Sequence, residues 1–486
     1  MKRIWILLLP MIFIFVACSG QCETEDYEAE EYDETQYEEE YSIAGEEPAV
    51  FIEYEIEYEM AEIEGIMRRI MPFGSLTIEH FLEDIDYMIY VLENNFPLLD
   101  VAYWARGIDY MELANSAREA VMSMEEPCED TFLAILRYHF MPLAGTGHFM
   151  VISHYIYEHM MSGVFYGGYN GIKWTRNQWL LRSPLASRFY DRCQDRIGAH
   201  DAAWERLIAA YGMPEHRFQA AEIHQQPVTT KSLEENRIAY VSTGRNMAGL
   251  QEGASQIADF FAQITEYDHL IIDLRGNGGG NIDAFLNVIL RPNLREAIES
   301  PNAFLFFMDG PHVRRFGERL FEPTIQNGFM TIFGSYSPVE EILANYYIPD
   351  ISHEDIERFH YGAPAGRLRA MAITPTGGMS NRATAFEGEI WLLTDHIIGS
   401  GAQLAAWYAK ETGFVTLVGD ISGGVFGGPR TLVLMPNTGI ALYFDIFYIT
   451  DSRGRPLEAG TIPHHFNRPG LDALETVLEL IAEGEY

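Results

Sequence analysis

The second half of the chain alternates short apolar runs with amphipathic segments. Apolar runs at 270–274, 390–394 and 414–418 are each about five residues long, and segments at 254–264 and 402–412 carry apolar residues every three to four positions. The short runs predict buried strands and the longer periodic segments predict helices. Strands that alternate with helices in this way indicate a mainly parallel sheet covered by helices, so we expect an α/β fold.

Two further patterns complete this half of the chain. The runs TLVLM and IALYF flank Pro436-Asn437-Thr438-Gly439, which predicts a β-hairpin. Apolar positions at 471–482 recur at the helical spacing and predict a closing amphipathic helix.

Residues 75–154 predict a small N-terminal helical domain. Thr77 can cap a helix with one apolar face that ends before Pro97. Residues 155–235 form a mixed intervening region to which the sequence assigns no function. Further helices in these two regions are expected at 110–124, 129–140 and 202–211.

The first 74 residues predict export and attachment to a membrane. Lys2 and Arg3 precede an apolar run at 4–16, which has the length of a signal-peptide core. Ala17-Cys18 then resembles a lipobox, so residues 1–17 are expected to be a lipoprotein signal peptide and Cys18 to carry the lipid. An ordinary secretory signal is the alternative. We expect an extracytoplasmic protein, anchored to a bacterial cell membrane through this lipid.

Residues 18–74 are strongly acidic and contain no Lys or Arg between 23 and 67. Such a segment repels itself and predicts a disordered tether, with calcium binding as the alternative. The formal net charge of -38 over 486 residues argues against a nucleic-acid partner. The remaining cysteines show no metal-ligand spacing, and a Cys128–Cys193 bridge stays open.

A glycine cluster stands out at 271–280, which reads IIDLRGNGGG. Four glycines after a strand are more than a turn requires, which indicates a close approach to the backbone. The G-x-G-x-x-G spacing of dinucleotide-binding loops and the lysine of phosphate-binding loops are both missing. The loop is therefore interpreted as a source of backbone amides for an oxyanion or a peptide strand.

Three polar residues in separate loops predict nucleophilic catalysis. Ser400 lies between glycines where a strand ends and a helix begins, although a serine there is often a simple helix cap. His148 follows Gly145-Thr146-Gly147, and Glu458 lies in a segment bracketed by glycines. A hydroxyl, an imidazole and a carboxylate on three loops are the components of a catalytic triad.

Five motifs in this order resemble the C-terminal-processing-peptidase and tricorn-core family of serine peptidases. They are DLRGNGGG, the strand ending in TD, the serine loop, the LVG strand with its glycine-rich loop, and LEAG-x-IP, and the match covers roughly 238–463. The resemblance implies a ClpP/crotonase-like core at 236–486, endopeptidase activity without a cofactor, and a peptide or unfolded protein as substrate.

The resemblance also assigns roles by position. Ser400 corresponds to the nucleophile, and its oxyanion hole would use the amide of Gly401 with that of Gly278 or Gly279. His148 and Glu458 match the base and the carboxylate of the tricorn-like branch, so Glu458 would hold the imidazole directly or through a polar side chain.

Besides His464, which stands where a closing I-P-D would have aspartate, three positions depart from the family pattern. Gly147 stands where that branch often has serine, Gln403 where the family commonly has glutamate, and Val425 where the processing branch has its lysine base. The alternative function is a catalytically inactive peptidase fold that captures peptides. A metal site at His464-His465 lacks further ligands at suitable spacing, and the sequence does not indicate an oligomeric state.

Overall fold

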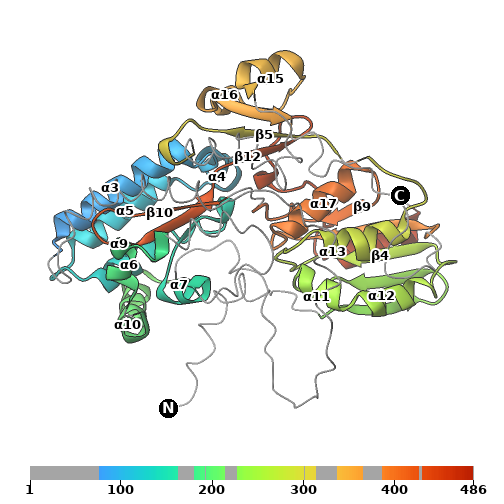
Figure 1. Ribbon diagram of the computed structural model, residues 1–486. Helices are drawn as coiled ribbons and strands as arrows, with labels where there is room; N and C mark the ends of the chain where they lie inside the picture. Colours follow the sequence, from blue (N-terminus) through green and yellow to red (C-terminus); the bar gives the residue numbers. More distant parts are fainter. Residues whose placement is uncertain are drawn as a thin grey trace, which may run out of the picture.

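The structure, a computed structural model, describes residues 76–161, 180–191, 193–213, 227–299, 301–313, 337–364, 386–425 and 430–484. The predicted signal peptide, lipid attachment at Cys18 and the acidic tether lie outside these residues. Figure 1 shows a helical unit on one side, a sheet unit on the other and a smaller group of elements above them.

The sheet unit is built on six strands in the order β13-β9-β8-β4-β3-β2, of which all but the edge strand β2 run parallel. Every residue of β3 and β4 is buried, which explains why these strands are continuous apolar runs. The predicted mainly parallel α/β sheet is confirmed. The strands are β2 (Thr229–Glu234), β3 (Ile238–Ser242), β4 (His269–Asp273), β8 (Glu389–Thr394), β9 (Thr416–Gly419) and β13 (His465–Phe466).

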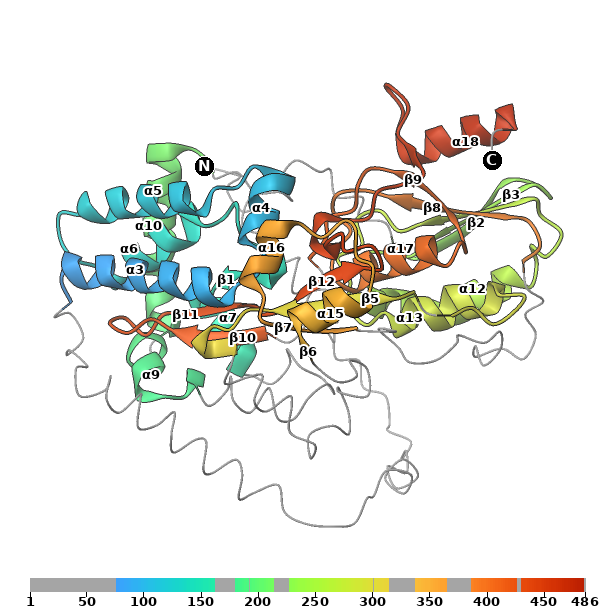
Figure 2. The same ribbon diagram turned by 90° about the horizontal axis from the view of Figure 1, so that it is seen from above.

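Helices cover both faces of this sheet (Figure 2). On one face, the closing helix α18 packs Val477 and Leu480 against Trp391 and Ile271 of the sheet. After the glycine loop the predicted helix is present, but it continues as a π-helical turn, η4, and a 3₁₀ turn, η5. The elements are α11 (Met247–Glu252), α12 (Ala254–Phe261), α13 (Asp283–Phe285), η4 (Leu286–Leu290), η5 (Arg291–Asn293), α17 (Gly401–Glu411) and α18 (Ala473–Glu483).

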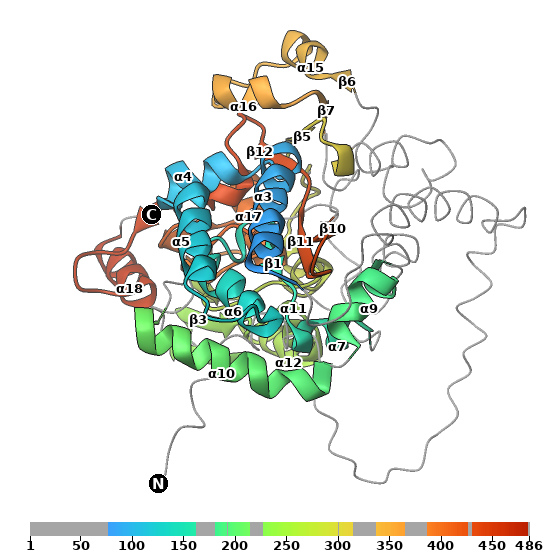
Figure 3. The same ribbon diagram turned by 90° about the vertical axis from the view of Figure 1, so that its left-hand side faces the viewer.

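The helical unit confirms the helices expected near the N-terminus. Thr77 is the N-cap of the first of them, and α10 is longer than the predicted 202–211 and packs across α6 (Figure 3). Cys128 is a free, exposed thiol, so the bridge to Cys193 is not formed. The helices are α3 (Ile78–Asn95), α4 (Leu99–Arg106), α5 (Tyr110–Met122), α6 (Glu129–His139), α7 (His154–Met161), α9 (Pro184–Tyr190) and α10 (Cys193–Tyr211).

The predicted hairpin is present, but it joins the helical unit instead of the sheet unit. Its strands β10 (Arg430–Leu434) and β11 (Ala441–Asp445) pair with each other, and β11 also pairs with β1 (Met150–Val151), which directly follows the predicted base. The turn of the hairpin is held by Asp84 of α3, which accepts hydrogen bonds from the backbone and hydroxyl of Thr438. Residues near the end of the chain therefore complete the unit that carries His148.

A third group of elements lies above the two units (Figure 1). It is a four-stranded antiparallel sheet in the order β12-β5-β7-β6 with two short helices. None of the helices in the described ranges is both long enough and apolar enough to span a bilayer. The elements are β5 (Ala303–Phe307), β6 (Ser337–Pro338), α15 (Val339–Asn345), α16 (His353–Arg358), β7 (Tyr361–Pro364) and β12 (Tyr448–Asp451).

Candidate active site

Ser400 lies at the turn between β8 and α17, where the sequence placed the nucleophile. Its φ of 53° is in the left-handed region, which costs a residue other than glycine about 1 kcal/mol or more and is typical of functional sites. Its N–H donates to the carbonyl of Gly424 at 3.1 Å, which holds the turn in place. The hydroxyl is partly exposed and has no hydrogen-bond partner within the described chain.

The glycine loop packs closely against the backbone of the Ser400 turn. A Cβ at Gly279, where φ is 101°, would lie 2.5 Å from the carbonyl oxygen of Gly399 and 2.8 Å from Cβ of Ser400. A Cβ at Gly401 would lie 2.0 Å from the carbonyl oxygen of Gly280. The glycines are therefore required because two loops approach more closely than side chains permit.

Asp395 fastens the same two loops together. Its carboxylate accepts hydrogen bonds from the N–H of Gly276, in the glycine loop, and from the N–H groups of Ile397 and Ile398. Burial raises the pKa of Asp395, although these three donors oppose the effect. The turn that carries the serine is thus positioned from both sides before any ligand binds.

Two of the three predicted oxyanion donors already have acceptors. The N–H of Gly278 donates to the carbonyl of Arg245 at 2.9 Å, and the N–H of Gly279 donates to Oδ1 of Asn277 at 2.9 Å. Within the described residues, the N–H groups of Gly401 and Gly280 have no acceptor. Of the predicted donors, only the amide of Gly401 is therefore available without an exchange of hydrogen-bond partners.

His148 ends the 3₁₀ turn η2 (Thr146–His148) and is buried. Its Nδ1 lies 2.7 Å from Oδ2 of Asp445, and its Nε2 lies 3.0 Å from Nη2 of Arg430. A carboxylate accepts and a guanidinium donates, so the proton is on Nδ1 and Nε2 is the acceptor. This is the tautomer that a general base requires, but its acceptor nitrogen is occupied by Arg430.

Glu458 lies in the 3₁₀ turn η7 (Leu457–Ala459) and is buried. Its carboxylate is 3.0 Å from Nη2 of Arg106, the last residue of α4, which also donates to the Glu458 carbonyl at 2.6 Å. Arg106 further donates to the hydroxyl of Thr146 at 3.0 Å and to the carbonyl of Gly423 at 3.1 Å. One guanidinium thus joins the Glu458 turn, the histidine turn and the loop that backs Ser400.

These contacts show how the three predicted loops converge. The sequence left open whether Glu458 holds the imidazole directly or through a polar side chain. The direct contact to the imidazole is made by Asp445, and Glu458 is linked to the histidine turn through Arg106. Sequence reasoning missed Asp445, Arg430 and Arg106, because each pairs with a residue far away in the chain. The one available signal was the carboxylate of Asp445 at the end of the apolar run IALYF.

The departures from the family pattern have local explanations. A Cβ at Gly147, where φ is 48°, would lie 2.5 Å from Cδ1 of Leu98, so a serine there would strain the backbone and displace this side chain. Gln403 is fully buried, and its amide donates to the carbonyl of Leu457 at 3.2 Å and to the hydroxyl of Thr461 at 3.0 Å. Gln403 therefore supports the Glu458 turn without a charge. Val425 is buried with a φ of 55°.

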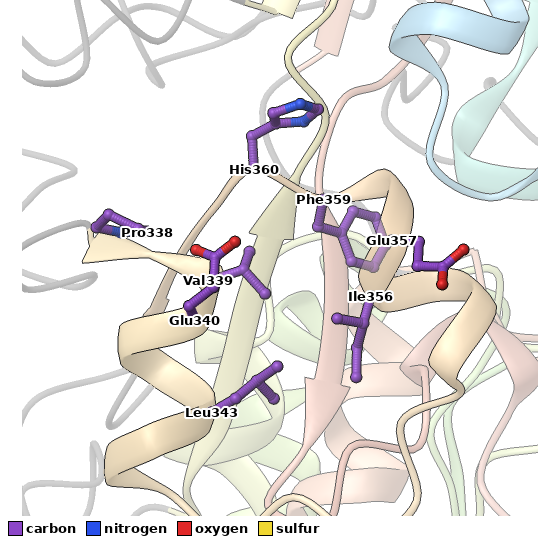
Figure 4. Close-up of a pocket in the computed structure, with 8 residues that line it drawn as sticks. All are labelled: Pro338, Val339, Glu340, Leu343, Ile356, Glu357, Phe359 and His360. Carbon is purple, nitrogen blue, oxygen red and sulfur yellow. The ribbon is translucent and has the colours of Figure 1, made fainter.

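A separate pocket of about 450 Å³ lies between α15 and α16 (Figure 4). Leu343, Ile356 and Phe359 supply apolar lining, and Glu340 and Glu357 lie beside them. It contains none of the predicted site residues. Among the residues that the structure describes, no group of three or more His, Cys, Asp or Glu side chains could hold a metal ion.

The fold and the site define an α/β protein with a strained serine beneath a glycine loop, which is the arrangement of a serine hydrolase. Residues 237–303 match the model of peptidase family S41. This match over part of the chain supports a serine-type peptidase and agrees with the resemblance to the C-terminal-processing and tricorn-like peptidases. No curated protein matches the sequence.

Three examples illustrate the solved structures that are similar to the chain. Mature CPAF complexed with lactacystin is 12% identical, covers 84% of this chain and 98% of its own, and has a TM-score of 0.46. The photosystem II D1 C-terminal processing protease is 14% identical over 50% and 49%, with a TM-score of 0.28. The tricorn protease is 15% identical over 51% and 18%, with a TM-score of 0.23. These values are too low to support an argument about the site.

Proposed function

We propose that this chain is a lipid-anchored, extracytoplasmic serine endopeptidase that acts through an acyl-enzyme on Ser400, with His148 as the base. The observation that carries the proposal is the strained Ser400 turn, which packs directly against a glycine loop. The loop that accepts the Ser400 N–H is tied through Arg106 to the turn that carries His148. The lipid anchor and the location rest on the Ala17-Cys18 pattern alone.

In the proposed mechanism, Nε2 of His148 takes the proton of the Ser400 hydroxyl once Arg430 has withdrawn. The serine oxygen attacks the scissile carbonyl, and the oxyanion is bound by the amide of Gly401 and one amide of the glycine loop. Asp445 accepts from Nδ1 and stabilises the imidazolium, which then protonates the leaving amine. A water molecule then gives its proton to His148 and attacks the acyl-enzyme, which releases the acyl group and restores Ser400.

One observation favours the alternative, a peptide-capturing protein without turnover. The acceptor nitrogen of His148 is bound to Arg430, and the amides of Gly278 and Gly279 already have acceptors. A protein fixed in this state would bind peptides along its loops but could not activate Ser400.

Labelling with a fluorophosphonate probe tests the proposed function. We expect one labelled residue, Ser400, with labelling abolished in Ser400→Ala and strongly reduced in His148→Ala. Ser232→Ala, at an exposed serine on β2, is the matched control and should be labelled like the unmodified chain. Peptide binding without any labelling of the folded, unmodified chain would establish the alternative function instead.

A further inference from the structure

The side chain of Arg430 is the most accessible member of the cluster that contains the base. It is 27% exposed, whereas the side chain of His148 is 9% exposed and that of Asp445 is fully buried. Arg430 begins β10, and residues 421–425 just before it include the carbonyl that anchors Ser400. A ligand that enters the cluster from solvent therefore reaches the guanidinium before the imidazole.

Arg430 contacts three groups of this cluster, and none of these contacts is a bidentate hydrogen-bonded pair with a carboxylate. Its hydrogen bond to His148 uses a neutral acceptor, its Nε is 3.4 Å from Oδ1 of Asp445, and its guanidinium carbon lies 5.9 Å from the ring centre of Tyr443. Oδ1 of Asp445 has no hydrogen-bond partner, so this ion pair is not a hydrogen-bonded one. A carboxylate that meets the guanidinium with two parallel hydrogen bonds binds more strongly than a neutral imidazole.

We propose that Arg430 is a carboxylate-binding residue of the substrate site, and that a substrate carboxylate draws its guanidinium away from His148 and frees the base. The inference rests on the proposed function and names its substrate class: peptides with a carboxylate close to the scissile bond. The carboxylate comes from an acidic side chain or from the end of the peptide. The net charge of the chain opposes such peptides at long range, but salt screens this repulsion beyond about 10 Å.

The proposal is tested by neutralising the substrate carboxylate. The full-length chain first selects a good substrate from a library of quenched fluorescent peptides. That peptide is then compared with a version in which Glu or Asp is replaced by its amide, and with a version whose C-terminus is amidated. One of the two changes should lower kcat/KM by roughly 10- to 100-fold, the range for a lost hydrogen bond to a charged group, and it identifies the source of the carboxylate.

Arg430→Met provides the second measurement. This variant should cleave the acidic and the neutralised peptide at similar rates, because it no longer binds the carboxylate. Its labelling by an uncharged fluorophosphonate should be faster than that of the unmodified chain, because nothing covers Nε2 of His148. Arg430→Lys should retain part of the discrimination, and Arg237→Met, at an exposed ion pair with Glu234, should leave both measurements unchanged.

The outcomes separate this inference from the proposed function. A chain that is labelled and cleaves peptides, but is indifferent to both neutralisations, remains a peptidase and overturns the inference. Retained discrimination in Arg430→Met overturns it as well. If Arg430→Met does not fold, the comparison of acidic and neutralised peptides on the unmodified chain still tests whether a substrate carboxylate is required. A folded chain without labelling or cleavage overturns the proposed function, and the inference with it.

Discussion

The two sides of the site are built in different ways. On the Ser400 side, loops of one sheet touch through bare backbone, and the glycines at 279 and 401 leave no space for a Cβ. On the His148 side, the imidazole is held by charged side chains from other parts of the chain, with Asp445 nearly 300 residues away. The proposed nucleophile is therefore positioned by steric fit, and the proposed base by polar contacts that have to assemble from distant segments.

This difference determines which changes each side tolerates. A steric fit is lost when a single methyl group is added, whereas a polar network can exchange partners without a change of fold. Nε2 of His148 is a place where partners can be exchanged. It now accepts a hydrogen bond from Arg430, and it would have to accept one from Ser400 for proton transfer. We therefore expect an exchange of partners on the His148 side to modulate activity, and an added methyl group on the Ser400 side to abolish it.

The largest effect is expected at the carboxylate that holds the imidazole. Asp445→Asn presents an amide N–H to Nδ1 of His148, so the ring adopts the other tautomer and Nε2 can no longer accept a proton. We expect kcat to fall by about 10³- to 10⁴-fold with little change in KM, the size known for such a change in a catalytic triad. Steady-state kinetics on a peptide substrate measure the effect.

The comparison variant for this prediction is Glu458→Gln. Arg106 keeps its bonds to the carbonyls of Glu458 and Gly423 and to Thr146, so kcat should fall by about 10-fold or less. A greater loss in Glu458→Gln than in Asp445→Asn would mean that Glu458 holds the imidazole directly in the active state, as the sequence resemblance allowed.

The next largest effect is expected on the steric side, where two adjacent glycines differ. Gly279→Ala places a methyl group against Gly399 and Ser400 at a positive φ, whereas Gly278→Ala has no atom within 4 Å of the new Cβ. Displacement of Ser400 by about 1 Å is expected to reduce turnover about 100-fold, and the strain to lower the free energy of unfolding by about 1–3 kcal/mol. Gly278→Ala should match the unmodified chain in turnover and in the free energy of unfolding.

Peptide turnover and denaturant unfolding, measured on the same preparations, check this pair. If Gly278→Ala is as inactive as Gly279→Ala, conformational freedom throughout the loop matters more than the contact with Ser400. The steric description of this side would then be wrong.

The same contrast explains how much of the fold the sequence could predict. The sheet, its flanking helices and the Ser400 turn follow from local apolar periodicity and glycine placement, and β4 and β8 lie within one residue of the predicted strands. The pairing of β11 with β1 could not be predicted, because no local pattern links strands so far apart in the chain. For the same reason the hairpin was expected in the core at 236–486, whereas it completes the helical unit.

The candidate site shows the same limit. The sequence indicated Ser400, His148 and Glu458 because each is set among glycines in a loop. It did not indicate Arg106, which resembles any arginine at the end of a helix, although its side chain joins the His148 turn, the Glu458 turn and the loop that backs Ser400. Side chains that act by contact across the fold leave no periodic signal, so the polar side of the site had to be seen in the structure.

The smallest effect concerns the hairpin that carries Arg430 and Asp445. Its turn is held to α3 by Asp84, whose pKa is raised by burial to about 6. A carboxyl group with a raised pKa stabilises the fold most at low pH, and this contribution is lost as the pH rises through 6. Between pH 5 and pH 7.5 the unmodified chain should therefore lose roughly 1 kcal/mol of stability relative to Asp84→Asn, whose side chain does not titrate.

Thermal melting of both proteins across this range measures the loss, which corresponds to a few degrees at most. Thr438→Val sharpens the test, because it removes a hydroxyl that donates to Asp84 at 2.6 Å and lowers its pKa. The transition should then move above pH 6. A gap between the unmodified chain and Asp84→Asn that stays constant with pH would show that Asp84 keeps one protonation state.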